Sequence, residues 1–195
     1  MINHFYAVMS RMKNIYRWGL MRNTRRENLS EHSLEVAQIA HALALIRNRR
    51  FGGNIDANYV AVAAMYHDTS EIITGDMPTP VKYYNAEIKT AYKRIEEVAE
   101  NQLIEMLPED FKEDFGKIYN PSDSVAEIVK AADKLSALIK CIEEINMGNR
   151  EFEDAQKTIV AAIKEIKIPE AHIFLEEFIP SFSLTLDQQR KIDDK

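Results

Sequence analysis

Apolar residues recur along this chain with the spacing of amphipathic helices. In segment 30–47, Leu34, Ala37, Ala40 and Ala44 are three or four positions apart, which places them on one helical face. The same reasoning predicts helices near 3–15 and at 57–73, 87–107, 125–147, 152–166 and 170–178. No alternation of period two persists, and the sequence FIPSFSLTLD at 178–187 is expected to form an ordered extended segment.

Residues that begin and end helices border these segments. Asn28 followed by Glu31, and Ser124 followed by Glu127, each fit a capping box, and Asp56 is placed to cap the next helix. Predicted helix ends are marked by Gly75, Pro108 and Gly148. With glycine and proline between the segments, the pattern predicts one all-α domain over residues 1–195.

Composition narrows the classes of protein to consider. The chain has 195 residues, of which 46% are hydrophobic and 29% charged, values ordinary for a globular protein with a core. A net charge of −6 argues against partners such as long nucleic acids or anionic membranes. No apolar run is long enough for a membrane span, and no signal peptide is expected. The one cysteine, Cys141, fits a reducing cytoplasm.

The pair His67-Asp68 lies late in a very apolar predicted helix, YVAVAAMYHDTSEII. On a regular helix His67 and Glu71 share one face, because they are four residues apart. Burying an imidazole and carboxylates is costly unless they are paired, and a divalent cation is a natural partner. A helix end that emerges into solvent explains the same residues equally well.

Two further residues extend this pair. His32 lies in the first turn of its predicted helix, and Asp133 interrupts an apolar face in IVKAADKLSALIK. Two imidazoles and two carboxylates suit Mn, Fe, Co, Ni or Zn better than Mg or Ca. The two carboxylates would balance a 2+ ion, so a phosphate at the same site would need a separate positive group. No comparable context surrounds the remaining histidines, His4, His41 and His172.

The order His32, His67-Asp68, Asp133 resembles the signature of the HD superfamily of metal-dependent phosphohydrolases, and more narrowly the bacterial 5'-deoxynucleotidases of the YfbR type. The blocks that carry the resemblance are RWGLMRNTRRENLSEHSLEVA (17–37), AMYHDTSEIITGDMPTPVKYY (64–84), KAADKLSALIKC (130–141) and FIPSFSLTLD (178–187). The resemblance implies an HD-domain helical bundle of about seven to nine helices. It also implies a homodimer that hydrolyses 2'-deoxynucleoside 5'-monophosphates to deoxynucleoside and phosphate.

The resemblance assigns roles to individual residues. His32, His67, Asp68 and Asp133 would hold one divalent transition metal ion such as Co or Mn, with His32 and Asp133 also near the substrate. Glu71 would act as general base or orient water, and Arg17 would clamp the phosphate. Trp18 would pack near the sugar and help to reject a 2'-hydroxyl. Nucleotide contacts are implied for a proline-stiffened loop made of Asp76, Met77, Pro78 and Thr79.

Three alternatives remain open. Another HD phosphohydrolase, acting on cyclic, polyphosphate or triphosphate nucleotides, would use the same metal ligands. A non-catalytic nucleotide-binding helical module differs in that Arg17 and Glu71 need not converge on the metal. A helical bundle without a site predicts that His32, His67 and Asp133 lie far apart.

Overall fold

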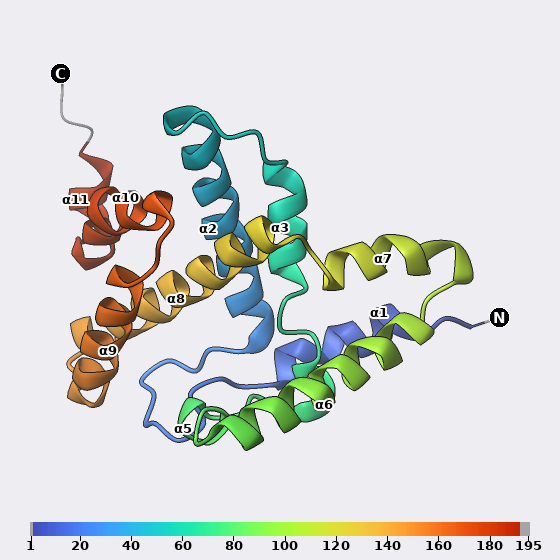
Figure 1. The fold of residues 1–195 in the computed structure, drawn as a ribbon. Coiled ribbons are helices and arrows are strands. Elements are labelled where there is room, and N and C mark those ends of the chain that lie inside the picture. The colour runs from blue at the N-terminus through green and yellow to red at the C-terminus, as the bar shows by residue number, and fades with distance from the viewer. Residues whose placement is uncertain (1, 192–195) are drawn as a thin grey trace.

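The computed structural model describes residues 2–191. The α-helices are α1 (Phe5–Met9), α2 (Leu29–Arg50), α3 (Ala57–Met65), α4 (Glu71–Thr74), α5 (Thr79–Lys82), α6 (Ala86–Glu105), α7 (Lys112–Tyr119), α8 (Asp123–Asn146), α9 (Glu153–Lys164), α10 (Pro169–Glu177) and α11 (Leu186–Arg190). Four 3-10 helices join them, namely η1 (Ser10–Asn14), η2 (Glu109–Phe111), η3 (Arg150–Phe152) and η4 (Ile179–Ser183). Figure 1 shows their arrangement.

The all-α prediction is confirmed for residues 2–191, where pairing between extended segments is limited to an isolated antiparallel bridge from Tyr16 to Asn28. The prediction of seven to nine helices is wrong, because these residues form 11 α-helices. The excess comes from helices of one or two turns, such as α4, α5 and α11, which are too short for an apolar period to show. That the whole chain forms one domain stays a prediction.

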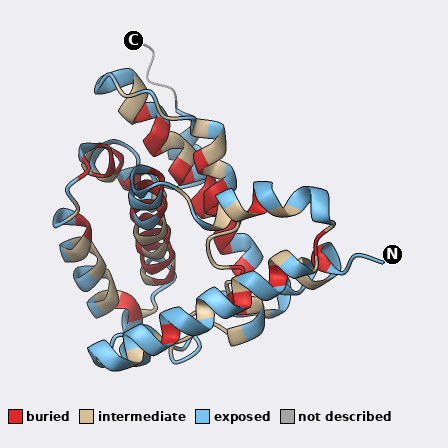
Figure 2. Cartoon of the chain, turned by 45° about the vertical axis from the view of Figure 1, so that its right-hand side comes forward, coloured by how far each residue is buried: buried red, intermediate tan, exposed pale blue. Residues whose placement is uncertain are grey.

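The main core lies where α2 packs against α3 and α8 (Figure 1). On α8, Ile128, Leu135 and Ile139 follow the i, i+7, i+11 spacing of one helical face, and all three are fully buried. Burial of each such side chain contributes roughly 1.5–3 kcal/mol. Buried residues gather inside the bundle, whereas α6 is mostly exposed (Figure 2). The helices that carry His32 and Asp133 are therefore fixed by the core.

A second, smaller core lies between α1, α6 and α7. It contains Phe5, Leu103 and Phe115, and Tyr66 packs against it. The ring of Tyr66 lies 5.3 Å from that of Phe115 in an edge-on arrangement. This contact holds the residue next to His67.

The predicted helix starts differ in outcome. The Asn28 capping box is confirmed, because its side chain accepts the Glu31 N–H while the Glu31 carboxylate accepts the Asn28 N–H. The Ser124 box is wrong: α8 begins earlier, with Ser122 at the N-cap, so Ser124 is already helical and cannot cap.

The extended segment predicted at 178–187 is also wrong. It contains η4 and the beginning of α11. Thr185 and Gln188 form a capping box there, so the segment carries a helix-start signal that its prolines and serines obscured.

Glu100 on α6 provides a test of stability against pH. Burial, followed by the charges of Glu96 and Glu97, raises its pKa to about 7. An acid whose folded pKa lies above the unfolded value destabilises the folded chain as pH rises above the unfolded pKa, and the loss is complete above the folded pKa. Glu100→Gln is therefore expected to add about 1 kcal/mol at pH 8, or about 3 °C in Tm, after allowance for solvent screening.

The gain should disappear near pH 4, where the carboxyl is neutral in both states. Calorimetry at the two pH values measures it, with the exposed Glu127→Gln on α8 as the matched control. An equal gain at both pH values would show that charge is not the cause.

Candidate metal centre

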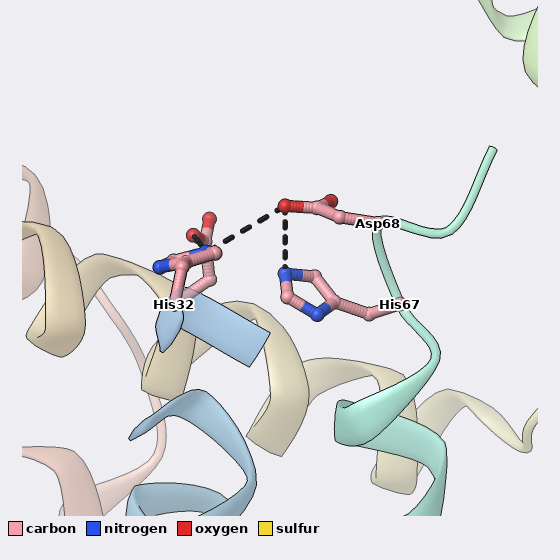
Figure 3. A group of neighbouring side chains, drawn as sticks. His32, His67 and Asp68 are labelled. Carbon is pink, nitrogen blue, oxygen red and sulfur yellow. Dashed lines mark ion pairs between the residues drawn. The ribbon is translucent and has the colours of Figure 1, made fainter. Parts of the chain in front are cut away.

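Four side chains from three parts of the chain converge at one end of the main core. His32 comes from the first turn of α2, His67 and Asp68 from the turn after α3, and Asp133 from α8. Each offers a ligand atom, and these atoms all lie within 4.8 Å of one another. Figure 3 shows His32, His67 and Asp68 pointing toward a common point. The alternative of a bundle with these residues far apart is therefore wrong.

The closest approaches within the cluster join imidazole nitrogens to carboxylate oxygens. His32 Nε2 lies 3.2 Å from Asp133 Oδ1 and 3.5 Å from Asp68 Oδ2. His67 Nε2 lies 3.1 Å from Asp68 Oδ2. The cluster therefore has the composition of a site for a borderline divalent ion.

The local backbone turns both His67 and Asp68 into the cluster. The chain leaves α3 at Met65, so the predicted continuous helix 57–73 is wrong, and α4 begins only at Glu71. The Thr69 hydroxyl donates to the Tyr66 carbonyl, and His67 Nδ1 lies 2.7 Å from the Ala64 carbonyl oxygen. Such bonds from side chains to nearby carbonyls compete with regular helical pairing.

The two imidazoles are prepared to bind a cation. The Ala64 carbonyl can only accept, so His67 Nδ1 carries a proton, and Nε2 is the nitrogen that would bind a metal ion in place of its own proton. Nε2 of both His32 and His67 is buried without a hydrogen-bond partner. Buried polar atoms of this kind normally have a partner, and a metal ion at the cluster would supply it for both. The residues present thus fit a divalent transition metal.

The charged groups of the cluster shift one another's pKa values. Burial alone would lower the pKa of His67, but the neighbouring Asp68 and Asp133 outweigh it and raise the pKa to about 9. Burial would raise the pKa of Asp68, yet His67, His32 and Arg17 hold it well below its ordinary value. The carboxylates are therefore ionised at neutral pH, as metal ligands must be.

Arg17 reaches into the cluster from the segment between η1 and α2. Its Nη1 lies 3.1 Å from Asp68 Oδ2, and its Nη2 lies 3.8 Å from Asp133 Oδ1. The antiparallel bridge from Tyr16 to Asn28 joins the two ends of this segment. It therefore fixes the backbone position of Arg17, which follows Tyr16. The guanidinium places a positive charge beside both carboxylates of the cluster.

Trp18 follows Arg17 and is held at the edge of the site. Its backbone adopts φ of +60°, a region that side-chain-bearing residues rarely occupy. The indole Nε1 donates to Glu27 Oε2 at 3.1 Å, and the ring lies 5.3 Å from the ring of Phe152. Trp18 is half-buried, so it is placed between solvent and core.

Glu27 is a residue that sequence reasoning missed. The same oxygen that accepts from Trp18 also accepts from Arg17 Nε at 3.3 Å, so Glu27 orients both neighbours. Glu27 lies ten positions after Arg17, too far along the chain for a local sequence pattern to connect the two. The only signal is its position as the first acid after the basic stretch from Arg11 to Arg26.

Glu71 is 5% exposed at the start of α4, and its Oε2 is buried without a hydrogen-bond partner. Burial, followed by the charges of Asp68 and Asp76, raises its pKa to about 9. The regular helical face that was expected to join Glu71 to His67 does not exist, because turns separate them. Glu71 nevertheless lies close enough to Asp68 and Arg17 to be affected by their charges.

Only part of the loop after α4 interacts with the charges of the cluster. Burial raises the pKa of Asp76, and the charge of Arg17 opposes that rise. Met77 and Pro78 are half-buried, whereas Thr79 is exposed at the start of α5. Among the loop residues, Asp76 therefore has the strongest link to the cluster.

Other histidines lie outside the cluster. His172 Nε2 donates to the Ile166 carbonyl at 2.8 Å, which accounts for this ring. Over the described range 2–191, a second group of His, Cys, Asp and Glu that could share an ion is not found.

The match to known proteins extends over most of the chain. Residues 4–182 match the family described as 5'-deoxynucleotidase YfbR-like. A 5'-deoxynucleotidase of Vibrio vulnificus is 54% identical over 189 residues, which cover 95% of this chain and 97% of that protein. The 5'-deoxynucleotidase YfbR of Shigella flexneri is 50% identical over 189 residues, with 95% of each chain covered.

Solved structures share the fold. An HD-domain phosphohydrolase from Listeria innocua has a TM-score of 0.80 at 25% identity, covering 92% of this chain and 88% of that one. The HD phosphohydrolase DatZ of cyanophage S-2L, solved with dA and one catalytic Zn²⁺ ion, has a TM-score of 0.63 at 19% identity, covering 90% and 96% of the two chains. Taken with the cluster's geometry and the family match over residues 4–182, the chain belongs to the 5'-deoxynucleotidase YfbR-like family of HD-domain phosphohydrolases.

Proposed function

We propose that the chain hydrolyses 2'-deoxynucleoside 5'-monophosphates at the cluster of His32, His67, Asp68 and Asp133, with one divalent transition metal ion such as Co or Mn. The observation that carries this proposal is the convergence of four ligand atoms within 4.8 Å, with Arg17 Nη1 3.1 Å from one of the carboxylates. The family and its curated relatives support the substrate class. A bound divalent ion supplies an activated water and polarises a phosphoryl oxygen.

The chain's own residues would divide the remaining work. Arg17 would pair with the phosphate, since a guanidinium can donate to two phosphoryl oxygens at once. Glu71 would accept the proton of the attacking water or orient that water. Asp76, Met77, Pro78 and Thr79 would border the nucleotide, and the charge of Arg17 acts on Asp76. His32 and Asp133 would contact both metal and substrate.

Phosphate release from a panel of nucleotides tests the proposal. Deoxy- and ribonucleoside 5'-monophosphates are supplied in turn to the metal-free protein, with Co, Mn, Mg or Zn added separately. The expected result is release from the deoxynucleotides with a transition metal and little release without one. Cyclic and triphosphate nucleotides are added to the panel, with their nucleotide products separated by chromatography; equal hydrolysis of these would favour another HD phosphohydrolase.

Trp18 gives a separate prediction about the sugar. Its ring is held on two sides, by Glu27 and by Phe152, so it can act as a rigid wall against a 2'-hydroxyl. Trp18→Ala is expected to reduce the deoxy-to-ribo ratio of kcat/KM about tenfold. The exposed Leu20→Ala in the same segment is the matched control. An unchanged ratio in Trp18→Ala would remove this role.

Assembly and location are two further parts of the proposal. The family resemblance supports a homodimer, and sedimentation of the purified chain would test it. In the described part of the chain, no helix has both the length and the apolar character needed to cross a bilayer. A cytoplasmic location is proposed from the single free cysteine, Cys141, which is buried.

A further inference from the structure

Ser136 is a polar residue in the middle of the main core. It lies on α8, three residues after Asp133, and its exposed fraction is 0%. The flanking Leu135 and nearby Ile139 belong to the apolar core. A buried hydroxyl without a partner is costly, so its contacts identify the reason for its position.

Both contacts of the Ser136 hydroxyl lead to α2. Ser136 Oγ donates to Glu35 Oε2 at 2.6 Å, and His32 Nδ1 lies 3.1 Å from the same Oγ. His32 and Glu35 are three residues apart, so they lie on the same side of α2. A continuous polar chain thus runs from the metal cluster through Ser136 to a carboxyl group.

The direction of these bonds fixes the form of the imidazole. A hydroxyl has one proton, and Ser136 gives it to Glu35. The bond to His32 must therefore be donated by Nδ1–H, so Nε2 is the nitrogen that can bind a metal ion. Nε2 is the buried nitrogen that faces Asp68 and Asp133 without a hydrogen-bond partner. His67 is oriented in the same way, because its Nδ1–H donates to the Ala64 carbonyl.

We propose that Ser136 and Glu35 are positioning residues for the metal, which hold His32 in the tautomer and orientation that present Nε2 to the ion. The inference rests on the metal site proposed above. Outer partners of this kind commonly change metal affinity about 10–100-fold when they are removed. Neither residue needs to contact substrate, so their effect should be seen in the absence of nucleotide.

Ser136→Ala is expected to weaken binding of Co²⁺ or Mn²⁺ about 10–100-fold, measured by competition with a chromophoric chelator. Ser33→Ala is the matched control, because Ser33 is also buried, adjoins His32 on α2, and has an Oγ without a hydrogen-bond partner. Ser33→Ala should bind metal as the unmodified protein does. Equal affinity in Ser136→Ala and Ser33→Ala would overturn the proposal.

Two further measurements separate positioning from folding. The Tm of each variant in EDTA reports stability without metal. The loss of metal affinity in Ser136→Ala should be larger than a loss of stability seen in that Tm can explain. Glu35→Gln removes the charge but keeps an acceptor for Ser136, so about threefold to tenfold weaker binding is expected. An unchanged affinity for the metal ion in Glu35→Gln would show that Glu35 does not help to position His32. If the unmodified protein bound neither ion, the metal site itself would be wrong.

Discussion

His67→Ala is expected to leave the protein unable to retain a divalent ion and to lower turnover of deoxynucleoside monophosphates by about three orders of magnitude or more. The imidazole offers Nε2 to the cluster and is locked by the Ala64 carbonyl, so no neighbouring side chain can replace it. Asp133→Ala should have the same outcome, because it removes half of the anionic charge that would balance the ion. Metal content after dialysis and phosphate release measure the two effects.

His41→Ala is the appropriate comparison for this result. His41 lies on α2 with His32 and is half-buried, but it is not part of the cluster. The variant should keep both metal and activity. Normal turnover in His67→Ala would show that the cluster is not the site of hydrolysis.

Glu71→Ala is expected to retain metal but lose about 10²–10⁴-fold in kcat, the usual contribution of a general base. Glu71 is buried beside Asp68, and in the metal-free chain its pKa is raised to about 9. A cation bound at Asp68 would lower that pKa, since a nearby positive charge favours the carboxylate. Activity should therefore fall as pH drops through the pKa of Glu71, and this dependence should be absent from the variant.

Metal content distinguishes a base from a ligand at this position. Loss of the ion in Glu71→Ala would make Glu71 a ligand, contrary to its place outside the group of four. Glu71→Gln provides the conservative counterpart, because it keeps the shape and removes only the basicity. It should be as slow as the alanine variant.

Local signals in the sequence account for much of the fold. The capping box of Asn28 and the N-cap of Asp56 each lie where predicted, because a cap is made by residues two or three positions apart. Gly148 adopts φ of +84° just after α8, as its C-terminal position required. The four residues predicted as ligands also come together, and their types and order in the sequence indicated this group; that they hold a metal ion stays a prediction.

The parts that were missed depend on contacts distant in sequence or on competing bonds. Propensity alone favoured helix through His67, and the turn arises from side-chain bonds to the Ala64 and Tyr66 carbonyls. Glu27 acquires its role only when the Tyr16–Asn28 bridge folds it back on Arg17. No local pattern indicates the role of Ser136, because its partners are about 100 residues away.

If Arg17 pairs with the phosphate as proposed, its ion pairs limit how tightly a reaction product can be held. In the free chain its guanidinium already contacts Asp68 at 3.1 Å and Glu27 at 3.3 Å. An arriving phosphate must share or displace these partners, so the net gain is the difference between two similar sets of ion pairs. This exchange disfavours long retention of inorganic phosphate after cleavage, and it favours release of the product over accumulation of an inhibited complex.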